Sequence, residues 1–343
     1  MYVKSDTASV QKSGLLVVTE PLTDRVFSKA LDVSGIKRDT FTIIPTTDQY
    51  CQYLDKAVAD TRPSLILALG DTPLRELSLV SGGISDLRGY VLPSRYNIPM
   101  IPTYPSHLVR GAFHLFGAFL HDIRRAHSYA FKGVPNKLET SYDLKPSRAV
   151  VNDYLDRLRA DRTLASAYDI ETAHILGEAE PKDWRLKKII QIQFSSAAGT
   201  ALVLPWEEAW LEAIQTILAT ENMKWGWNDR LSDRLALKGQ GMIINGEQHD
   251  LMNAWGHLQP NFVSSKDAGN DEDKGIPARL MSLQACVSFY FPYEEPWKGV
   301  VQRAIAEGAD PQQVLRWYGA RDADLTFRVG VRIFKALKDG GLW

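Results

Sequence analysis

The sequence has few of the features that mark several large protein classes. It holds only two cysteines in 343 residues, Cys51 and Cys286, and nothing in it resembles a disulfide framework, a zinc site or a phosphate-cradling glycine loop. Because the two cysteines fall in different halves of the chain, we expect reduced thiols and a cytoplasmic protein. No apolar run approaches the roughly 20 residues of a transmembrane helix, and the first residues show no secretory signal pattern. We therefore expect no membrane partner.

A surplus of positive charge is also missing. The 40 lysines and arginines nearly balance the 41 aspartates and glutamates, which leaves a net charge of −1. This balance argues against tight binding over a long stretch of nucleic acid, but not against binding of a few terminal nucleotides. The length and a hydrophobic content of 45% suffice for two globular domains with substantial cores.

An acidic pair, Asp169 and Glu171, emerges from an apolar run. The residues before it, 165–168, predict a buried strand that continues through the pair. Side chains at positions i and i+2 of a strand point to the same face, so both carboxylates can bind metal together. Hard divalent cations such as Mg²⁺ prefer carboxylate oxygens. The pair is therefore a candidate metal site.

Two further acidic elements follow in the sequence. Tyr318 and Asp322 lie four residues apart in a long helical pattern, which places both on one helix face. Between the pair and this helix, residues 226–234 carry Asp229 and Asp233 at a strand-to-helix junction. Carboxylates from several elements can hold two divalent ions about 3.5–4 Å apart, which supply hydroxide and neutralise the leaving oxygen in phosphodiester hydrolysis. The phenol is then expected to position the attacking water or the scissile phosphate.

In this order, the motifs resemble the proofreading exonuclease domain of family A DNA polymerases over residues 160–340. The resemblance implies a DEDD-type, ribonuclease-H-like fold and a 3′→5′ DNA exonuclease with two Mg²⁺ or Mn²⁺ ions per site. It also implies single-stranded DNA 3′ ends as substrate, a DNA polymerase domain or subunit as partner, and a phage-like replication system. The resemblance assigns metal binding to Asp169, Glu171, Asp233 and Asp322, catalysis to these four and Tyr318, and substrate contacts to Thr172, Asn228 and Ser232.

The middle motif departs from the family pattern, which is Asn, two variable residues, an aromatic residue and Asp. Anchoring on Asn228 places Ser232 at the acid position, whereas a shift by one residue places Asp233 there. Both alignments stay open, and we adopt Asp233. A serine would remove a carboxylate from the second metal site. It would favour the alternative function, a catalytically degenerate DNA-binding or scaffold subunit of a replication complex.

The surrounding segments predict the rest of the second fold. Residues 189–194 and 200–204 alternate as strands and complete a three-stranded meander with the acidic strand. Residues 207–219 have the spacing of an amphipathic helix, and 223–227 predict the next strand. Pro311 suits the first turn of the last helix. We expect a mixed sheet flanked by helices.

The N-terminal part predicts a separate α/β layer, because buried strands near 15–20 and 63–70 alternate with helical stretches. Residues 67–74, 87–89 and 103–110 resemble the uracil-DNA glycosylase superfamily, particularly its iron–sulfur branch. The cluster cysteines are missing, residues 19–22 replace the first catalytic loop, and the histidine of the last loop is deleted. The resemblance implies a glycosylase-like α/β sandwich that does not excise bases.

The predicted organisation is therefore a glycosylase-like domain at 1–130, a linker at 131–150 and an exonuclease domain at 151–343. Proline, glycine and charged residues break the periodicity in the linker. We expect four arginines of the first domain to contact DNA phosphates without reading the base sequence. These are Arg88, Arg110, Arg124 and Arg125.

Overall fold

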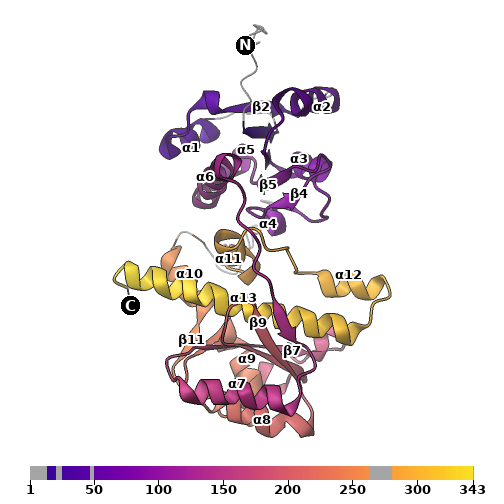
Figure 1. Cartoon of the computed structure of the whole chain (residues 1–343), viewed down its shortest axis with the longest axis vertical. Coiled ribbons are helices and arrows are strands. Elements are labelled where there is room, and N and C mark those ends of the chain that lie inside the picture. The colour runs from indigo at the N-terminus through magenta and orange to yellow at the C-terminus, as the bar shows by residue number, and fades with distance from the viewer. Residues whose placement is uncertain (1–13, 21–24, 47–49, 261, 263–279, 343) are drawn as a thin grey trace. The chain divides into compact units, whose positions relative to one another are not determined.

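The computed structural model describes residues 14–20, 25–46, 50–260, 262 and 280–342, and Figure 1 shows their helices and strands. The chain divides into two compact units. Unit 1 comprises Met1–Lys137, Asn261–Leu280 and Val287–Pro296, and unit 2 comprises Leu138–Pro260, Met281–Cys286 and Trp297–Trp343. None of the helices formed by these described residues is long and apolar enough to span a membrane.

The stretch predicted as a linker, 131–150, is partly regular. It contains the end of helix α6 (Phe116–Lys132), strand β6 (Ser141–Asp143) and the start of helix α7 (Arg148–Ala160). Segments from the last third of the sequence also belong to unit 1, whereas the sequence predicted a single crossing. The ends of the two domains otherwise stay a prediction.

Unit 1 contains a five-stranded sheet in the order β2-β1-β3-β5-β4. Its strands are β1 (Leu15–Thr19), β2 (Phe41–Pro45), β3 (Leu65–Leu69), β4 (Leu92–Pro93) and β5 (Pro99–Thr103). Only β4, at one edge, runs antiparallel to its neighbour. Every residue of β1 and β3 is buried, as expected for parallel strands covered on both faces, and this explains their nearly continuous Leu, Ile and Val content.

Helices complete this α/β layer. They are α1 (Val26–Ser34), α2 (Tyr50–Thr61), α3 (Asp71–Leu77), α4 (Ile84–Leu87), α5 (Ser106–Gly111) and α6. Helix α11 (Leu283–Tyr290) is divided between the units, and only its residues from Val287 on belong to unit 1. The α/β class predicted for the N-terminal part is confirmed. Its glycosylase-like character stays a prediction, and Pro21 and Leu22 of the first matched loop lie outside the described residues.

Two of the four arginines predicted to contact DNA phosphates are buried, so this prediction is wrong for them. Arg88 donates to Asp122 through Nε at 3.0 Å and Nη2 at 2.7 Å, and both side chains are buried. Arg125 donates to the carbonyl oxygen of Gly89 at 3.0 Å and to those of Ser288 and Phe289. A guanidinium that satisfies buried acceptors is unavailable to a phosphate outside.

The other two arginines are exposed. Arg124 donates to the carbonyl oxygen of Val33 at 2.8 Å, which ties part of its guanidinium to α1. Arg110 lies on α5 with an exposed side chain. Their contacts with DNA stay a prediction.

Unit 2 is built on a six-stranded mixed sheet in the order β11-β10-β7-β8-β9-β6. The strands beside β6 are β7 (Ser166–Thr172), β8 (Ile189–Ser195), β9 (Thr200–Pro205), β10 (Lys224–Gly226) and β11 (Gln248–Asp250). β7, β8 and β9 form the predicted antiparallel meander, and β10 and β11 extend the sheet in parallel from the other edge of β7. This order is that of the ribonuclease-H-like fold, so the predicted fold class is confirmed.

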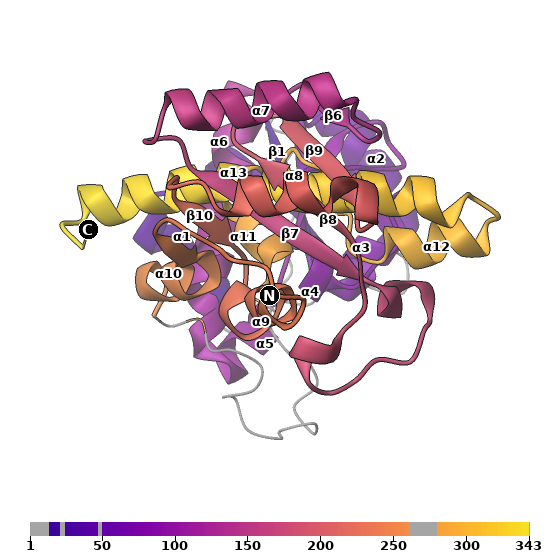
Figure 2. The same ribbon diagram turned by 90° about the horizontal axis from the view of Figure 1, so that it is seen from below.

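Strand alternation gives this sheet two chemically different faces. Tyr168 and Ile170 of β7 point into an apolar core formed with α7, α8 (Glu208–Leu218) and α9 (Asp233–Gly239). Asp169 and Glu171 therefore point to the opposite face, because successive side chains of a strand alternate. Helix α13 (Pro311–Asp339) covers that face, and Figure 2 shows it behind the strands with α7 and α8 in front. The remaining helices are α10 (Leu251–Leu258) and α12 (Val300–Ala306).

The packing of α13 is set by a few specific contacts. Asp310 caps its N-terminus by accepting from the Gln312 N–H at 3.0 Å. Gly319 faces β8 so closely that an added Cβ would lie 2.4 Å from the side-chain nitrogen of Gln193. Further along, Asp324 accepts from the Gly199 N–H at 2.7 Å and from the hydroxyl of Tyr142. These contacts hold the helix against the acidic face of the sheet and fix its position along the helix axis.

Candidate metal centre

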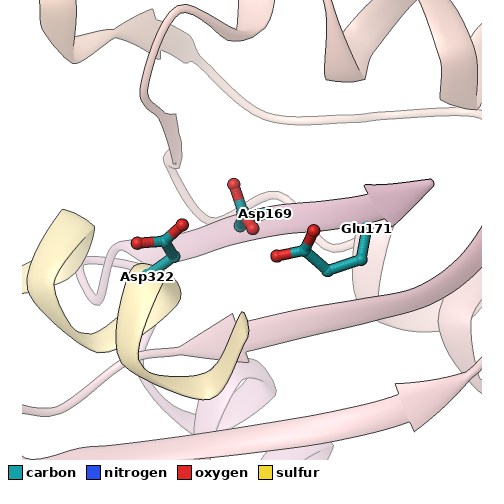
Figure 3. Close-up of side chains that lie close together, drawn as sticks. All are labelled: Asp169, Glu171 and Asp322. Atoms are coloured by element: carbon teal, nitrogen blue, oxygen red, sulfur yellow. The ribbon is translucent and has the colours of Figure 1, made fainter. Parts of the chain in front are cut away.

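Three carboxylates meet between β7 and α13. Each of Asp169, Glu171 and Asp322 offers an oxygen, and these oxygens all lie within 4.8 Å of one another (Figure 3). Two of the side chains come from one face of a strand and the third from the helix packed on that face, as the i, i+2 spacing predicts. Glu171 and Asp322 are buried and Asp169 is half-buried. The structure thus brings together the first and last motifs, which are about 150 residues apart in the sequence.

The cluster is electrostatically unfavourable in the absence of a cation. Burial raises the pKa values of Asp169 and Glu171 well above the ordinary carboxyl range, and the negative charge of Asp322 is the next largest cause for both. Lys298 lowers both values but does not cancel the shift. Like charges held close in a desolvated site favour proton uptake or cation binding. The three side chains are therefore suited to a divalent cation.

The donor set indicates which kind of cation fits. All of the donors in the cluster are carboxylate oxygens, which suit Mg²⁺ or Mn²⁺ rather than a metal that prefers thiolate or imidazole ligands. Among the described residues, the only ion pair formed by these three carboxylates is that of Asp322 with Lys298, so a net negative charge remains. The number of ions that the site holds stays a prediction.

Asp233 lies beside the cluster as the first residue of α9, with a buried side chain. Its carboxylate accepts from the backbone N–H of Ile170, between the two acids of β7. This N–H is accessible because β10 pairs only with the first two residues of β7. Burial, followed by the charge of Asp229, raises the pKa of Asp233 to about 8. Asp233 is not part of the group of three, and its role as the fourth metal ligand stays a prediction.

The other acid of the middle motif has a structural place. Asp229 is fully buried and accepts from the hydroxyl of Tyr168 at 2.7 Å and from Arg234 at 2.7 Å. Since Tyr168 points away from the acidic face of β7, its hydroxyl holds Asp229 apart from the three clustered carboxylates. Asp229 anchors the loop that delivers Asp233.

The predicted substrate contacts are placed as follows. Asn228 is exposed and adopts a left-handed conformation with φ of 57°, and its carbonyl oxygen accepts from the Ser232 hydroxyl at 2.5 Å. Ser232 is buried. Thr172 ends β7 and donates to Glu180 at 2.9 Å. Their contacts with substrate stay predictions.

Tyr318 lies one turn before Asp322 on α13, as the sequence predicted, and a lysine joins the two. The Nζ of Lys298 lies 2.7 Å from Asp322 Oδ2 and 2.8 Å from the hydroxyl oxygen of Tyr318. The fully buried Trp297 donates from Nε1 to Asp322 Oδ1. Sequence reasoning missed both residues, because they precede α12 in an irregular segment without periodicity.

Unit 1 has a smaller polar group of its own. His107 Nδ1 lies 3.7 Å from a carboxylate oxygen of Glu20, and the Thr72 N–H donates to the same carboxylate at 3.4 Å. Glu20 and Gly70 follow β1 and β3, where the strand order reverses, and ligands of doubly wound sheets bind at such points. The resemblance of residues 103–110 to the glycosylase superfamily implied that the last-loop histidine is deleted. The structure places His107 next to the acid that follows β1.

Comparisons with known proteins give a likeness in structure only. No family model matches the sequence, and a search of curated proteins finds no match. Among solved structures, Brucella melitensis NrnC is similar with a TM-score of 0.37 and 15% identity over 54% of this chain and 79% of NrnC. A structure titled as Brucella melitensis NrnC with bound Mg²⁺ is similar with a TM-score of 0.36 and 15% identity over the same shares of both chains.

Proposed function

We propose that this protein is a metal-dependent 3′→5′ DNA exonuclease that proofreads for a family A-type DNA polymerase. The observation that carries the proposal is the meeting of Asp169, Glu171 and Asp322 within 4.8 Å on a ribonuclease-H-like sheet, with Tyr318 one turn away. The order of the motifs supports it, as does the resemblance of residues 160–340 to the proofreading domain. Partnership with a polymerase rests on that resemblance alone.

The residues have separate tasks in this proposal. Asp169, Glu171 and Asp322 would hold the divalent cations, with Asp233 as a further ligand. When bound, such ions supply hydroxide near neutral pH and neutralise the leaving oxygen. Burial, followed by the charge of Asp322, raises the pKa of Tyr318 above its ordinary value, so the phenol keeps its proton and acts as a hydrogen-bond donor. It would orient the attacking water toward the phosphate.

A hollow in unit 2 supports a single-stranded substrate. It has a volume of about 660 Å³, and its lining residues include Arg230, Arg234, His249, His257, Phe334 and Leu337. Among the described residues of its lining the one acid is Asp250. Its carboxylate accepts from the backbone N–H groups of Asn228 at 3.1 Å and Met252 at 3.0 Å, which partly neutralise its negative charge. Arg234 is paired with Asp229, so the exposed Arg230 is the cation of this lining that suits a phosphate, and Phe334 is the aromatic side chain that suits a base of a single strand.

The test of activity uses a single-stranded DNA oligonucleotide labelled at its 5′ end, incubated with Mg²⁺ or Mn²⁺. Stepwise shortening is expected, whereas a 3′-labelled strand should release labelled mononucleotide at once. An RNA of the same sequence tests the sugar preference, and Asp156→Asn on the exposed face of α7 is the matched control for Asp169→Asn. Absence of hydrolysis with both metals refutes the exonuclease and leaves the alternative, a non-catalytic DNA-binding or scaffold subunit.

The substrate path is tested at Arg230, whose side chain is exposed in the lining of the hollow. Arg230→Gln should raise the KM for a single strand several-fold and lower the slope of log Kd against log salt by about one, with little change in kcat. Arg159→Gln, an exposed residue of α7, is the matched control. An unchanged KM and salt slope would place the strand elsewhere.

We also propose that unit 1 is a glycosylase-like layer that binds DNA without excising uracil. The proposal rests on the altered first loop and the deleted histidine of the matched motifs. A uracil-containing duplex incubated with the protein and a chelator, then treated with alkali, should stay intact. Cleavage under these conditions would show base excision, and the Glu20 and His107 pair would be the first residues to substitute.

A further inference from the structure

The Lys298 ammonium lies beside the carboxylate cluster and contacts one of its three acids, Asp322. A cluster that binds divalent cations is expected to leave its acids free of protein cations. Here the ammonium contacts Asp322 Oδ2 at 2.7 Å, while the indole of Trp297 occupies Oδ1. Both oxygens of Asp322 therefore have a protein donor at a fixed position.

The same ammonium fixes the direction of the phenol proton. Lys298 donates to the Tyr318 hydroxyl oxygen at 2.8 Å, which occupies a lone pair of that oxygen. The remaining O–H must then point away from the lysine. Without the ammonium, the phenol O–H could turn to the nearest carboxylate and would no longer be available to a water molecule. The lysine thus sets both the charge at Asp322 and the orientation of Tyr318.

We propose that Lys298 is a positioning residue that weakens metal binding by the cluster and at the same time makes the bound metal site catalytically effective. This inference rests on the proposed exonuclease, which it extends by one residue. Its charge opposes a divalent cation at Asp322, and its hydrogen bond holds the Tyr318 hydroxyl in the orientation that the attacking water requires. The two effects have opposite consequences, one for metal affinity and one for turnover.

The test is Lys298→Met, which keeps the aliphatic length and removes the charge and the donor. The side chain is 38% exposed, so its replacement leaves no buried cavity of the full side-chain volume. Calorimetric titration with MnCl₂ should show at least about tenfold tighter binding, because a like charge next to the ion is gone. The kcat for single-stranded DNA should fall roughly 10- to 100-fold, which is at or below the lower limit of about 100-fold for groups that transfer the proton themselves, because the lysine acts only through Tyr318.

The opposite signs of these effects separate a positioning role from a merely structural one, since a damaged site would lose both affinity and turnover. Lys298→Arg keeps the charge and should bind Mn²⁺ close to the wild-type affinity. In a Tyr318→Phe background, Lys298→Met should lower kcat little further. Lys335→Met, at an exposed lysine of α13, is the matched control and should change neither quantity.

Each outcome is decisive. Unchanged or weaker Mn²⁺ binding by Lys298→Met overturns the inference, and so does tighter binding with an unchanged kcat in an active enzyme. If the wild-type protein hydrolyses no nucleic acid, the proposed function fails on its own. The titration then still decides whether the lysine opposes the metal, because it needs no substrate.

Discussion

Asp169→Asn should stabilise the metal-free protein and strongly reduce its stabilisation by Mg²⁺. The asparagine keeps the shape of the side chain and removes one of three negative charges whose oxygens lie within 4.8 Å of one another. Two unit charges at that separation repel by about 3.5 kcal/mol at an effective dielectric constant of 20. Asp169 faces two such partners.

Part of this repulsion is already relieved in the wild-type protein. The positive charge of Lys298 opposes the repulsion, and the raised pKa values of Asp169 and Glu171 mean that the metal-free cluster binds protons more readily than ordinary carboxyl groups do. We therefore expect a net gain in the free energy of unfolding of about 2 kcal/mol in EDTA. For a unit of this size that corresponds to a rise in Tm of about 4–8 °C.

The assay is thermal unfolding in EDTA and in saturating Mg²⁺. The wild-type protein should gain about 2.7 kcal/mol when Mg²⁺ is present at 100 times its Kd, whereas Asp169→Asn should gain much less. Asp156→Asn, at an exposed carboxylate of α7, should leave both measurements unchanged. A lower Tm of Asp169→Asn in EDTA together with an intact Mg²⁺ response would refute a like-charge metal site at these residues.

Three other predictions follow from the structure. Asp233→Asn should lower exonuclease activity by orders of magnitude and Ser232→Ala only slightly, and equal effects in a kcat measurement would reject the alignment that selects Asp233. Asp122→Asn should cost about 3–5 kcal/mol in denaturant unfolding, because it leaves the buried Arg88 without its charged partner. Burial, followed by Arg125, lowers the pKa of His121 to about 4, so its unfolded state binds the proton first and stability falls between pH 6.5 and 4. His121→Gln should flatten a plot of unfolding free energy against pH in that window, and an unchanged slope would contradict the assignment.

The parts of the fold that depend on local periodicity were predictable from the sequence. The strand of Asp169 and Glu171 and the helix of Tyr318 and Asp322 have strong alternation and helical spacing, and both motifs lie where the sequence placed them. Their meeting required one further condition, that the helix packs on the acidic face of the strand. The apolar alternation of β7 meets this condition, because Tyr168 and Ile170 pack into the apolar core on the other face of the strand.

The wrong predictions for Arg88 and Arg125 show that local sequence patterns do not determine which long-range partners bury a charged side chain. The basic neighbours Arg124 and Lys132 favour a surface position for Arg125 in the sequence. On α6, however, it shares the buried face with Phe119, Asp122 and Ala126, and that helical pattern was present in the sequence. The acceptors that keep it buried, the carbonyls of Ser288 and Phe289, are more than 160 residues away in the chain. No local signal identifies partners at that distance.

The middle motif explains why alignment alone could not choose its acid. After β10 the chain takes one left-handed residue, Asn228, and one 3-10 turn over Asp229–Leu231 before α9 begins. This irregular turn decides which carboxylate reaches β7. The Asp229 side chain accepts from Tyr168 and Arg234, so the next acid, Asp233, is the one that accepts from the N–H of Ile170, between the two acids of β7. Since Ser232 and Asp233 are adjacent, a single residue inserted or removed in this turn would exchange their places, so the conformation of the loop decides which of the two side chains lies beside β7.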